Sequence, residues 1–292
     1  MLTPEYLHAL QNLPLAARRA AEGLLHGAHL SRRKGAGMEF SQYRPYQPGD
    51  DLRRLDWRLA ARSDRYYLRE SEVDTSLVVH LVLDATASMN HQDDNGLSKL
   101  HYGRLLCAAL AYVATQQGDA VALTVLHPGG LRHLPPRADA RQLSRLYHAL
   151  ETTEAAGQFP DSATLAPLTA RRQPALTICV SDLYEASGEI ERLLTHLRAT
   201  SGDVLLLHLM AHNELQFSHQ DAVTLRDLET GQTLQIDAGQ QRGAYQQQLQ
   251  HWLRETAQQA RRQGFDYHLL DISQPLDSAI REFLRRRDSG RS

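Results

Sequence analysis

The fold is decided by the stretch Leu77-Val78-Val79-His80-Leu81-Val82-Leu83-Asp84-Ala85-Thr86-Ala87-Ser88-Met89. Its first seven residues are almost all aliphatic, as in a strand that is buried on both faces of a parallel sheet. Similar apolar runs recur along the chain and alternate with stretches of helical periodicity. The predicted strands are 77–83, 120–126, 175–180, 204–210 and 266–272, and the predicted helices are 99–117, 139–150, 187–200, 240–263 and 275–287.

This alternation predicts an α/β fold with a doubly wound, mostly parallel sheet and right-handed crossovers. A Pro-Gly-Gly turn predicts a short return strand at 131–134. We expect the sheet domain to span residues 76–292, with a β-hairpin insertion near 222–237. Residues 1–75 are expected to form a separate N-terminal segment that is helical at first and then rich in arginine.

Two helices are predicted in that N-terminal segment. Thr3-Pro4-Glu5 has the features of a helix start, and helical sequence continues from it to about Gly27 with a break near Pro14. Further on, Pro48-Gly49 favours a tight turn, after which leucines at helical spacing predict a short amphipathic helix with an arginine-rich outer face through Ala61. These leucines are Leu52, Leu55 and Leu59.

Composition excludes several classes of protein. The 292 residues are 42% hydrophobic and 23% charged with a net charge of −2, so bulk charge favours neither a nucleic acid nor an anionic membrane as partner. Cys107 and Cys179 lie in apolar runs, which indicates buried thiols in a reducing compartment rather than a disulfide scaffold. Because no targeting signal and no apolar run of membrane-spanning length is found, a cytoplasmic location without a membrane span is expected.

Polar oxygen donors follow two of the predicted strands. Asp84, Thr86 and Ser88 come directly after the first strand, and Asp182 follows the strand at 175–180. Ligands of open α/β sheets bind at the carboxyl ends of strands, and hard oxygen donors with few charges suit Mg²⁺ or Mn²⁺. The alternative is that Asp84 and Thr86 only cap the following turn and no metal binds.

This arrangement resembles the metal-ion-dependent adhesion site (MIDAS) of von Willebrand factor A domains, a Rossmann-like fold. In that family a partner's acidic residue fills the metal's free position. The family usually has serine at the place of Thr86, and threonine retains the hydroxyl. The resemblance also implies a loop threonine as a ligand, for which Thr164 is the candidate, although the usual glycines before it are missing.

The segment before the sheet is similar to the signature of the uncharacterised family called domain of unknown function fifty-eight. The matching residues are Gly35 to Phe40, Tyr43 to Arg58, Ala61-Arg62, Asp84 to Met89, Ser181-Asp182 and Asp227 to Gly231. The resemblance implies a von Willebrand A-like domain that works beside a MoxR-type AAA+ ATPase in chaperone-like protein complex assembly or maturation. It does not identify the client protein.

The arginine-rich part of the signature suggests both an ion-pair network and a partner interface. Arginine and aromatic side chains favour protein interfaces, whereas arginines interleaved with aspartates favour internal ion pairs, and both interpretations stay open. The candidate interface residues are Arg44, Tyr46, Arg53, Trp57, Arg58 and Arg62.

Three other functions have partial support in the sequence. Asp84 beside Mg²⁺ suits a phosphoryl-transfer or hydrolase enzyme of the haloacid-dehalogenase type, but the acid/base aspartate expected two residues later is Thr86 here. Ten basic residues between Ser31 and Arg69 suggest nucleic-acid binding, but five interleaved carboxylates would repel phosphate. His208 and His212 are four residues apart, but at a strand end rather than on a helix, which disfavours a soft-metal site. The sequence therefore predicts a non-enzymatic, metal-dependent adaptor or co-chaperone.

Overall fold

The computed structural model describes residues 12–27, 40–45, 59, 66–71, 77–127, 130–161, 175–184, 188–200, 202–217 and 222–289. The chain divides into two compact units. One comprises Met1–Ala28 together with Leu77–Ser292, and the other comprises His29–Ser76. Each unit is described by itself below.

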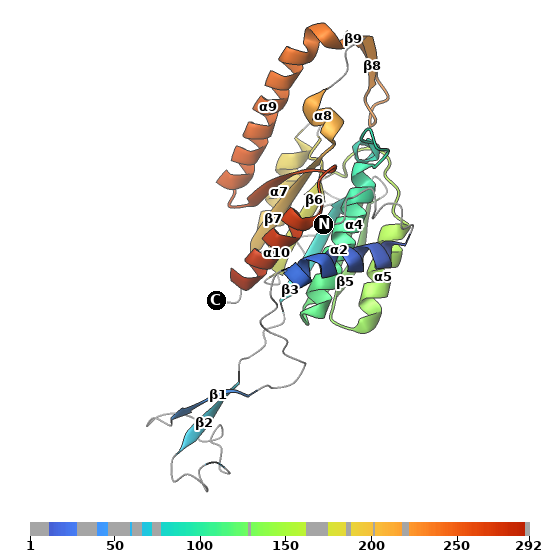
Figure 1. The fold of residues 1–292 in the computed structure, drawn as a ribbon. Helices are drawn as coiled ribbons and strands as arrows, with labels where there is room; N and C mark the ends of the chain where they lie inside the picture. The colour runs from blue at the N-terminus through green and yellow to red at the C-terminus, as the bar shows by residue number, and fades with distance from the viewer. Residues whose placement is uncertain are drawn as a thin grey trace. The chain divides into compact units, whose positions relative to one another are not determined.

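A six-stranded sheet forms the centre of the larger unit (Figure 1). Its strand order is β10-β7-β6-β3-β4-β5, and every neighbouring pair is parallel except β4 and β5. The expected doubly wound, mostly parallel sheet with a return strand after β4 is therefore confirmed. The strands are β3 (Val78–Asp84), β4 (Ala120–His127), β5 (Gly130–Arg137), β6 (Ala175–Ser181), β7 (Asp203–Met210) and β10 (Asp266–Asp271).

Helices cover both faces of this sheet because its central strands are apolar on both sides. Leu81 and Leu83 of β3 belong to the core beneath one group of helices, and Val82 between them belongs to the core beneath the other group. The first group is α2 (Leu13–Gly27), α4 (Lys99–Gln116), α5 (Ala140–Glu151) and α10 (Asp277–Ser289); the second is α7 (Glu189–Thr200) and α9 (Ala238–Arg262).

Helix α2 begins one residue before Pro14, at the expected break. The Asn12 side chain accepts a hydrogen bond from the Leu15 backbone amide at 2.9 Å and caps the helix start. Its alanine face, Ala16, Ala17, Ala20 and Ala21, is buried in the same core as α4. The expected single segment 1–75 is thus divided, because α2 packs with the sheet domain. The predicted start at Thr3 lies outside the described residues.

The expected hairpin insertion is present as an antiparallel pair, β8 (Ala222–Arg226) and β9 (Thr233–Asp237). Asp227 shapes its turn, since its Oδ1 accepts hydrogen bonds from the backbone amides of Glu229 and Thr230 at 2.8 and 3.1 Å. Gly231 closes the turn with a φ of +74°, which suits glycine. A short helix that the sequence did not predict, α8 (His212–Gln216), lies earlier in the chain, directly after β7.

The smaller unit contains a two-stranded antiparallel sheet, β1 (Phe40–Pro45) and β2 (Tyr67–Ser71), that the sequence did not predict. Arg44 pairs with Leu68 in this sheet. The predicted amphipathic helix through Ala61 lies outside the described residues, except for a helical Leu59.

Candidate metal centre

The predicted donors meet at the carboxyl ends of two neighbouring strands. Asp84 is the last residue of β3, and Asp182 follows the last residue of β6. The parallel register pairs Leu83 with Val180, so the two strands end side by side. Both carboxylates are only 1% exposed. The structure therefore brings together the two acidic residues that the sequence singled out.

The carboxylate of Asp84 accepts two hydrogen bonds from neutral donors. The backbone amide of Thr86 donates to Oδ1 at 2.9 Å, and the hydroxyl of Ser181 donates to Oδ2 at 2.6 Å. Burial raises the pKa of Asp84, and the negative charge of Asp182 raises it further. Among the described residues no cationic side chain contacts Asp84. This buried carboxyl group thus has no counter-charge within that part of the chain.

The hydroxyls of Thr86 and Ser88 lie beside each other, with their oxygens 3.0 Å apart. The Ser88 hydroxyl also donates to Asp182 Oδ1 at 3.2 Å. Thr86 precedes the short 3₁₀ helix η2 (Ala87–Asn90), but its side chain makes no capping hydrogen bond to that helix. The simple capping alternative therefore accounts for the Asp84 contact with the Thr86 amide and not for the position of the two hydroxyls.

A buried lysine that the sequence did not single out neutralises Asp182. The ammonium of Lys99 lies 2.6 Å from Asp182 Oδ2 and 3.0 Å from Glu214 Oε1, and Lys99 is only 3% exposed. Burial alone would lower the pKa of Lys99, but the charges of Asp182 and Glu214 outweigh it and raise the pKa. Burial alone would likewise raise the pKa of Asp182, but Lys99 lowers it. The sequence offered one indication that this residue is special, because Lys99 is one of only two lysines in the chain.

The donor set fits a small hard cation. Adjacent ligands of octahedral Mg²⁺ at about 2.1 Å are separated by about 3 Å, which is the spacing of the Thr86 and Ser88 hydroxyl oxygens. In the part of the chain that the structure describes, no three His, Cys, Asp or Glu side chains form a metal-binding group, so any cation here depends on hydroxyl ligands. The expected loop ligand, Thr164, lies outside the described residues.

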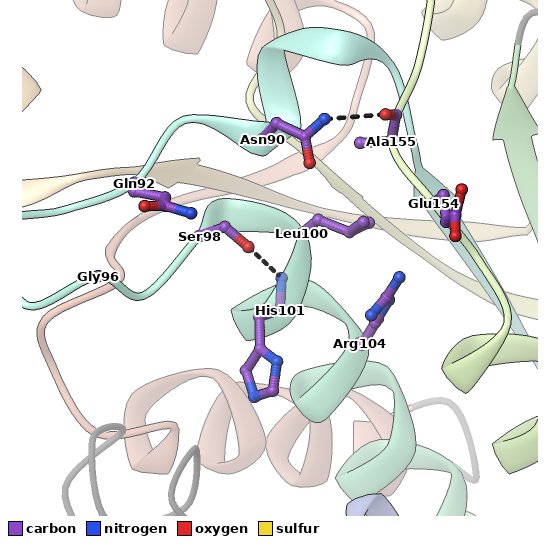
Figure 2. Close-up of a pocket in the computed structure, with 9 residues that line it drawn as sticks. All are labelled: Asn90, Gln92, Gly96, Ser98, Leu100, His101, Arg104, Glu154 and Ala155. Carbon is purple, nitrogen blue, oxygen red and sulfur yellow. Dashed lines mark hydrogen bonds between the residues drawn. The ribbon is translucent and has the colours of Figure 1, made fainter. Parts of the chain in front are cut away.

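A surface depression of about 500 Å³ is lined by Asn90, the last residue of η2, and by residues of the segment that follows (Figure 2). Asn90 and Ala155 are joined across its rim by a hydrogen bond of 2.8 Å, and Arg104 projects into it from α4. None of the predicted metal ligands lines it. Its lining residues are Asn90, Gln92, Gly96, Ser98, Leu100, His101, Arg104, Glu154 and Ala155.

The two histidines considered for a soft-metal site have separate partners. His208 Nδ1 lies 2.7 Å from the Tyr267 hydroxyl inside the domain, whereas His212 Nδ1 lies 2.8 Å from Asp271 Oδ2 in a half-exposed pair. The two imidazoles therefore do not share a ligand position. Of the six candidate interface residues, Arg44 has a described backbone in β1, and the remaining five lie outside the described residues.

Comparison with known proteins gives a family match and sequence relatives. The model of the family described as "Protein of unknown function DUF58" matches residues 42–255. "Uncharacterized protein Rv1480" of Mycobacterium tuberculosis and "Uncharacterized protein Mb1516" of Mycobacterium bovis are each similar to this chain, with 26% identity over 237 residues. The matches cover 78% of this chain and 72% of each relative.

Solved structures with a similar fold share little sequence with this chain. BatB from Bacteroides thetaiotaomicron is 16% identical with a TM-score of 0.47, covering 73% of this chain and 100% of that one. An aerotolerance-related membrane protein from Bacteroides fragilis is 17% identical with a TM-score of 0.45, covering 72% and 100%. The VWA domain of SpRpn10 is 10% identical with a TM-score of 0.39, covering 71% and 95%. Within the described ranges of this chain, no helix has both the length and the apolarity to cross a membrane.

Proposed function

Because this chain belongs to the DUF58 family of proteins of unknown function, whose description assigns no activity, we propose a role from its site. The protein is a non-enzymatic, metal-dependent protein-interaction module. Its own residues hold Mg²⁺ or Mn²⁺, and a carboxylate of a partner protein completes the coordination. The proposed ligands are Asp84, Thr86, Ser88, Thr164 and Asp182.

The observation that supports this proposal most is the environment of Asp84. A buried carboxyl group without a counter-charge is costly, and proteins normally relieve that cost with a cation or by protonation. Here the group faces a second carboxylate, Asp182, across two adjacent hydroxyls. A bound divalent ion would supply positive charge at this point. It would also offer a free coordination position to one more oxygen ligand.

The residue two positions after Asp84 disfavours the enzymatic alternative. Enzymes of the haloacid-dehalogenase type place an acid/base aspartate there, whereas this chain has Thr86, whose hydroxyl is not an acid or base near neutral pH. An interaction role requires no acid or base at this position.

We propose that the partner is a MoxR-type AAA+ ATPase and that the pair acts in the cytoplasm on a client protein during complex assembly. This part of the proposal rests on the family resemblance of the sequence. In the proposed pair, this chain recognises the partner protein and the ATPase hydrolyses the nucleotide. The arginine-rich segment is proposed as a second contact surface, with no part for nucleic acid.

Calorimetric titration of Mg²⁺ and Mn²⁺ tests the metal site. We expect saturable binding at one site in the parent protein and its loss in Asp84→Asn, which keeps the side-chain shape but removes the charge. Asp203→Asn is the matched control, because Asp203 is exposed at the opposite end of the sheet, at the start of β7. Asp182→Ala is a poor choice, since it would leave buried Lys99 without its partner at 2.6 Å.

Affinity for a MoxR-type ATPase tests the partner. Chelators are unsuitable because the ATPase needs Mg²⁺ itself, so Asp84→Asn is compared with Asp203→Asn at constant Mg²⁺. Loss of binding in Asp84→Asn alone is the expected result. Equal partner affinity in the two variants, or a parent protein that takes up no metal, would contradict the proposal.

A further inference from the structure

The tip of the β8–β9 hairpin lies against the metal centre. The Tyr184 hydroxyl donates to Asp227 Oδ2 at 3.2 Å, and the Tyr184 backbone amide lies 3.3 Å from Asp182 Oδ1. One residue therefore links the hairpin turn to a proposed metal ligand. Figure 1 shows the hairpin reaching back from the start of α9 towards η2, the segment that carries Ser88.

Hydrogen bonds within the hairpin turn fix the backbone position of Glu229. Asp227 holds the backbone amides of Glu229 and Thr230, and these bonds, led by the Thr230 amide, lower the pKa of Asp227. The ionised Asp227 side chain thus ties the turn to Tyr184 on one side and to the Glu229 backbone on the other. A turn held in this way presents its Glu229 side chain in a restricted set of positions.

The Glu229 side chain carries a buried oxygen that has no hydrogen-bond partner. Oε1 is inaccessible to solvent, and no donor among the described residues binds it. Burial raises the pKa of Glu229 to about 7. A hydrogen bond between the Ser88 hydroxyl and the Glu229 carboxyl group lowers this pKa, and the charges of Asp182 and Asp84 raise it further. The Glu229 carboxyl group is therefore close enough to Ser88 and both site aspartates to interact with them.

A buried acceptor without a donor is unfavourable unless something else binds it. Glu229 Oε1 has no donor among the described residues, and Asp84, whose oxygens both accept hydrogen bonds, has no counter-charge there, so a single divalent cation would compensate both. Without a cation, Glu229 does not form a three-carboxylate metal-binding group with Asp84 and Asp182. We propose that a cation held by these two aspartates recruits Glu229 as this chain's own carboxylate at the open position of the metal site, so that a partner's carboxylate must displace the hairpin to bind. This inference rests on the metal site proposed above and adds the regulation of that site.

The tethered Glu229 carboxylate would select between competing ligands of the metal. A group held on the same chain competes at an effective concentration that reaches the millimolar range, without the entropy loss of bringing two molecules together. Small free carboxylates would therefore be excluded. A protein partner that adds further contacts outside the metal shell would still displace Glu229, and this raises selectivity for such a partner.

Titration of Mn²⁺ alone tests the role of Glu229. Mn²⁺ is chosen because the relaxation of water protons counts the water molecules bound to it. Glu229→Gln is expected to bind Mn²⁺ at least about tenfold more weakly than the parent, and Glu229→Ala is expected to hold one more exchangeable water on the ion. Glu255→Gln, a change on the exposed side of α9 where Glu255 is 64% exposed, is the matched control and is expected to match the parent.

A second arm uses acetate as the probe carboxylate. Acetate is expected to remove that additional water from Mn²⁺-loaded Glu229→Ala, and a higher acetate concentration is expected to be needed before the loaded parent changes, because Glu229 competes there at millimolar effective concentration. If the parent binds Mn²⁺ while Glu229→Gln keeps the same or higher affinity and Glu229→Ala keeps the same hydration, the role of Glu229 is overturned and the metal site stands. If the parent binds no Mn²⁺, both proposals fail together.

Discussion

Two buried carboxylates lie at one end of the sheet, and they are neutralised in different ways. Asp182 has the Lys99 ammonium at 2.6 Å, whereas the donors to Asp84 among the described residues are neutral groups of Ser181 and Thr86. The proposed need for a cation is therefore concentrated on Asp84. Lys99 keeps Asp182 charged whether or not a metal is present.

Removal of the lysine should destabilise the protein. Lys99→Met leaves buried Asp182 without its counter-charge, and losing one partner of a buried ion pair costs about 3–5 kcal/mol. Urea denaturation in metal-free buffer measures this loss. The double variant Lys99→Met/Asp182→Leu removes both charges and is expected to recover most of the stability. A single variant as stable as the parent would show that the pair is not maintained in solution.

Acidification should destabilise the protein through two histidines, buried His208 and partly buried His80. Burial lowers the pKa values of His208 and His80 to about 4. The charge of Lys99 lowers the pKa of His208 further, and the charge of His133 lowers the pKa of His80 further. Because each unfolded imidazole titrates near 6.5, the unfolded state binds more protons between pH 6.5 and 4. Stability is thus present above pH 6.5 and falls by about 3 kcal/mol per histidine as the pH drops towards 4.

Thermal unfolding between pH 7.5 and 5 measures this dependence. His208→Phe keeps a ring packed against Trp252 and Tyr267 but cannot be protonated, so its melting temperature should decrease less on acidification than that of the parent. His251→Phe alters a histidine that is 67% exposed and should keep the parental dependence. Identical pH profiles for His208→Phe and the parent would contradict the assignment.

At the scale of secondary-structure elements, the position of α4 on the sheet places Lys99 beside Asp182 at the proposed metal centre. Its first residue is Lys99, and its Gly103 lies against the strand that carries Asp84. A Cβ atom on Gly103 would come within 3.0 Å of Leu83 Cδ1 and 3.5 Å of Leu209 Cδ1. Glycine at this position thus lets the helix approach the sheet closely.

Filling this contact should therefore destabilise the fold. Gly103→Val is expected to cost about 1–3 kcal/mol by overpacking, because its extra carbons meet Leu83 and Leu209. Gly243→Val in α9 is the matched control, since a Cβ there has no neighbour within 4 Å, and its stability should stay within about 0.5 kcal/mol of the parent. Equal stability of the two variants in urea denaturation would show that α4 has room to adjust.

At the scale of the whole molecule, the larger unit is built from two separate parts of the chain. Residues 1–28 precede the smaller unit in sequence, yet α2 packs into the core shared by α4, α5 and α10. The small alanine side chains of α2 allow it to lie close to α4. The sheet domain is therefore incomplete without a segment nearly fifty residues upstream of it.

Two shortened chains test this organisation. A chain of residues 77–292 alone would expose the apolar surface that α2 covers, and its melting temperature should be lower than that of the full chain by at least about 5 °C. A chain in which a long Gly/Ser linker replaces residues 29–76 keeps both parts and should melt close to the full chain. Equal melting temperatures for the two shortened chains would contradict a stabilising role for α2.

The sequence by itself determined the succession of the larger unit's strands and long helices along the chain and the meeting of Asp84 with Asp182, whereas the order of the strands within the sheet came from the structure. Apolar runs identify buried strands locally, and the carboxyl ends of parallel strands lie at one edge whatever the details of packing. The strands β1 and β2 were not predicted because Phe40–Pro45 and Tyr67–Ser71 mix polar and aromatic residues and lack a continuous apolar run.

Only the tertiary structure decided what surrounds the two aspartates. The partners of Lys99, the contact of Ser181 with Asp84 and the position of Glu229 beside Ser88 join residues that are about 80 to 140 positions apart in the chain. Such contacts depend on the crossing of helices over the sheet and on the hairpin folding back, and no local spacing encodes them. The charge balance of the site, and with it the proposed need for a cation, is therefore a property of the folded molecule.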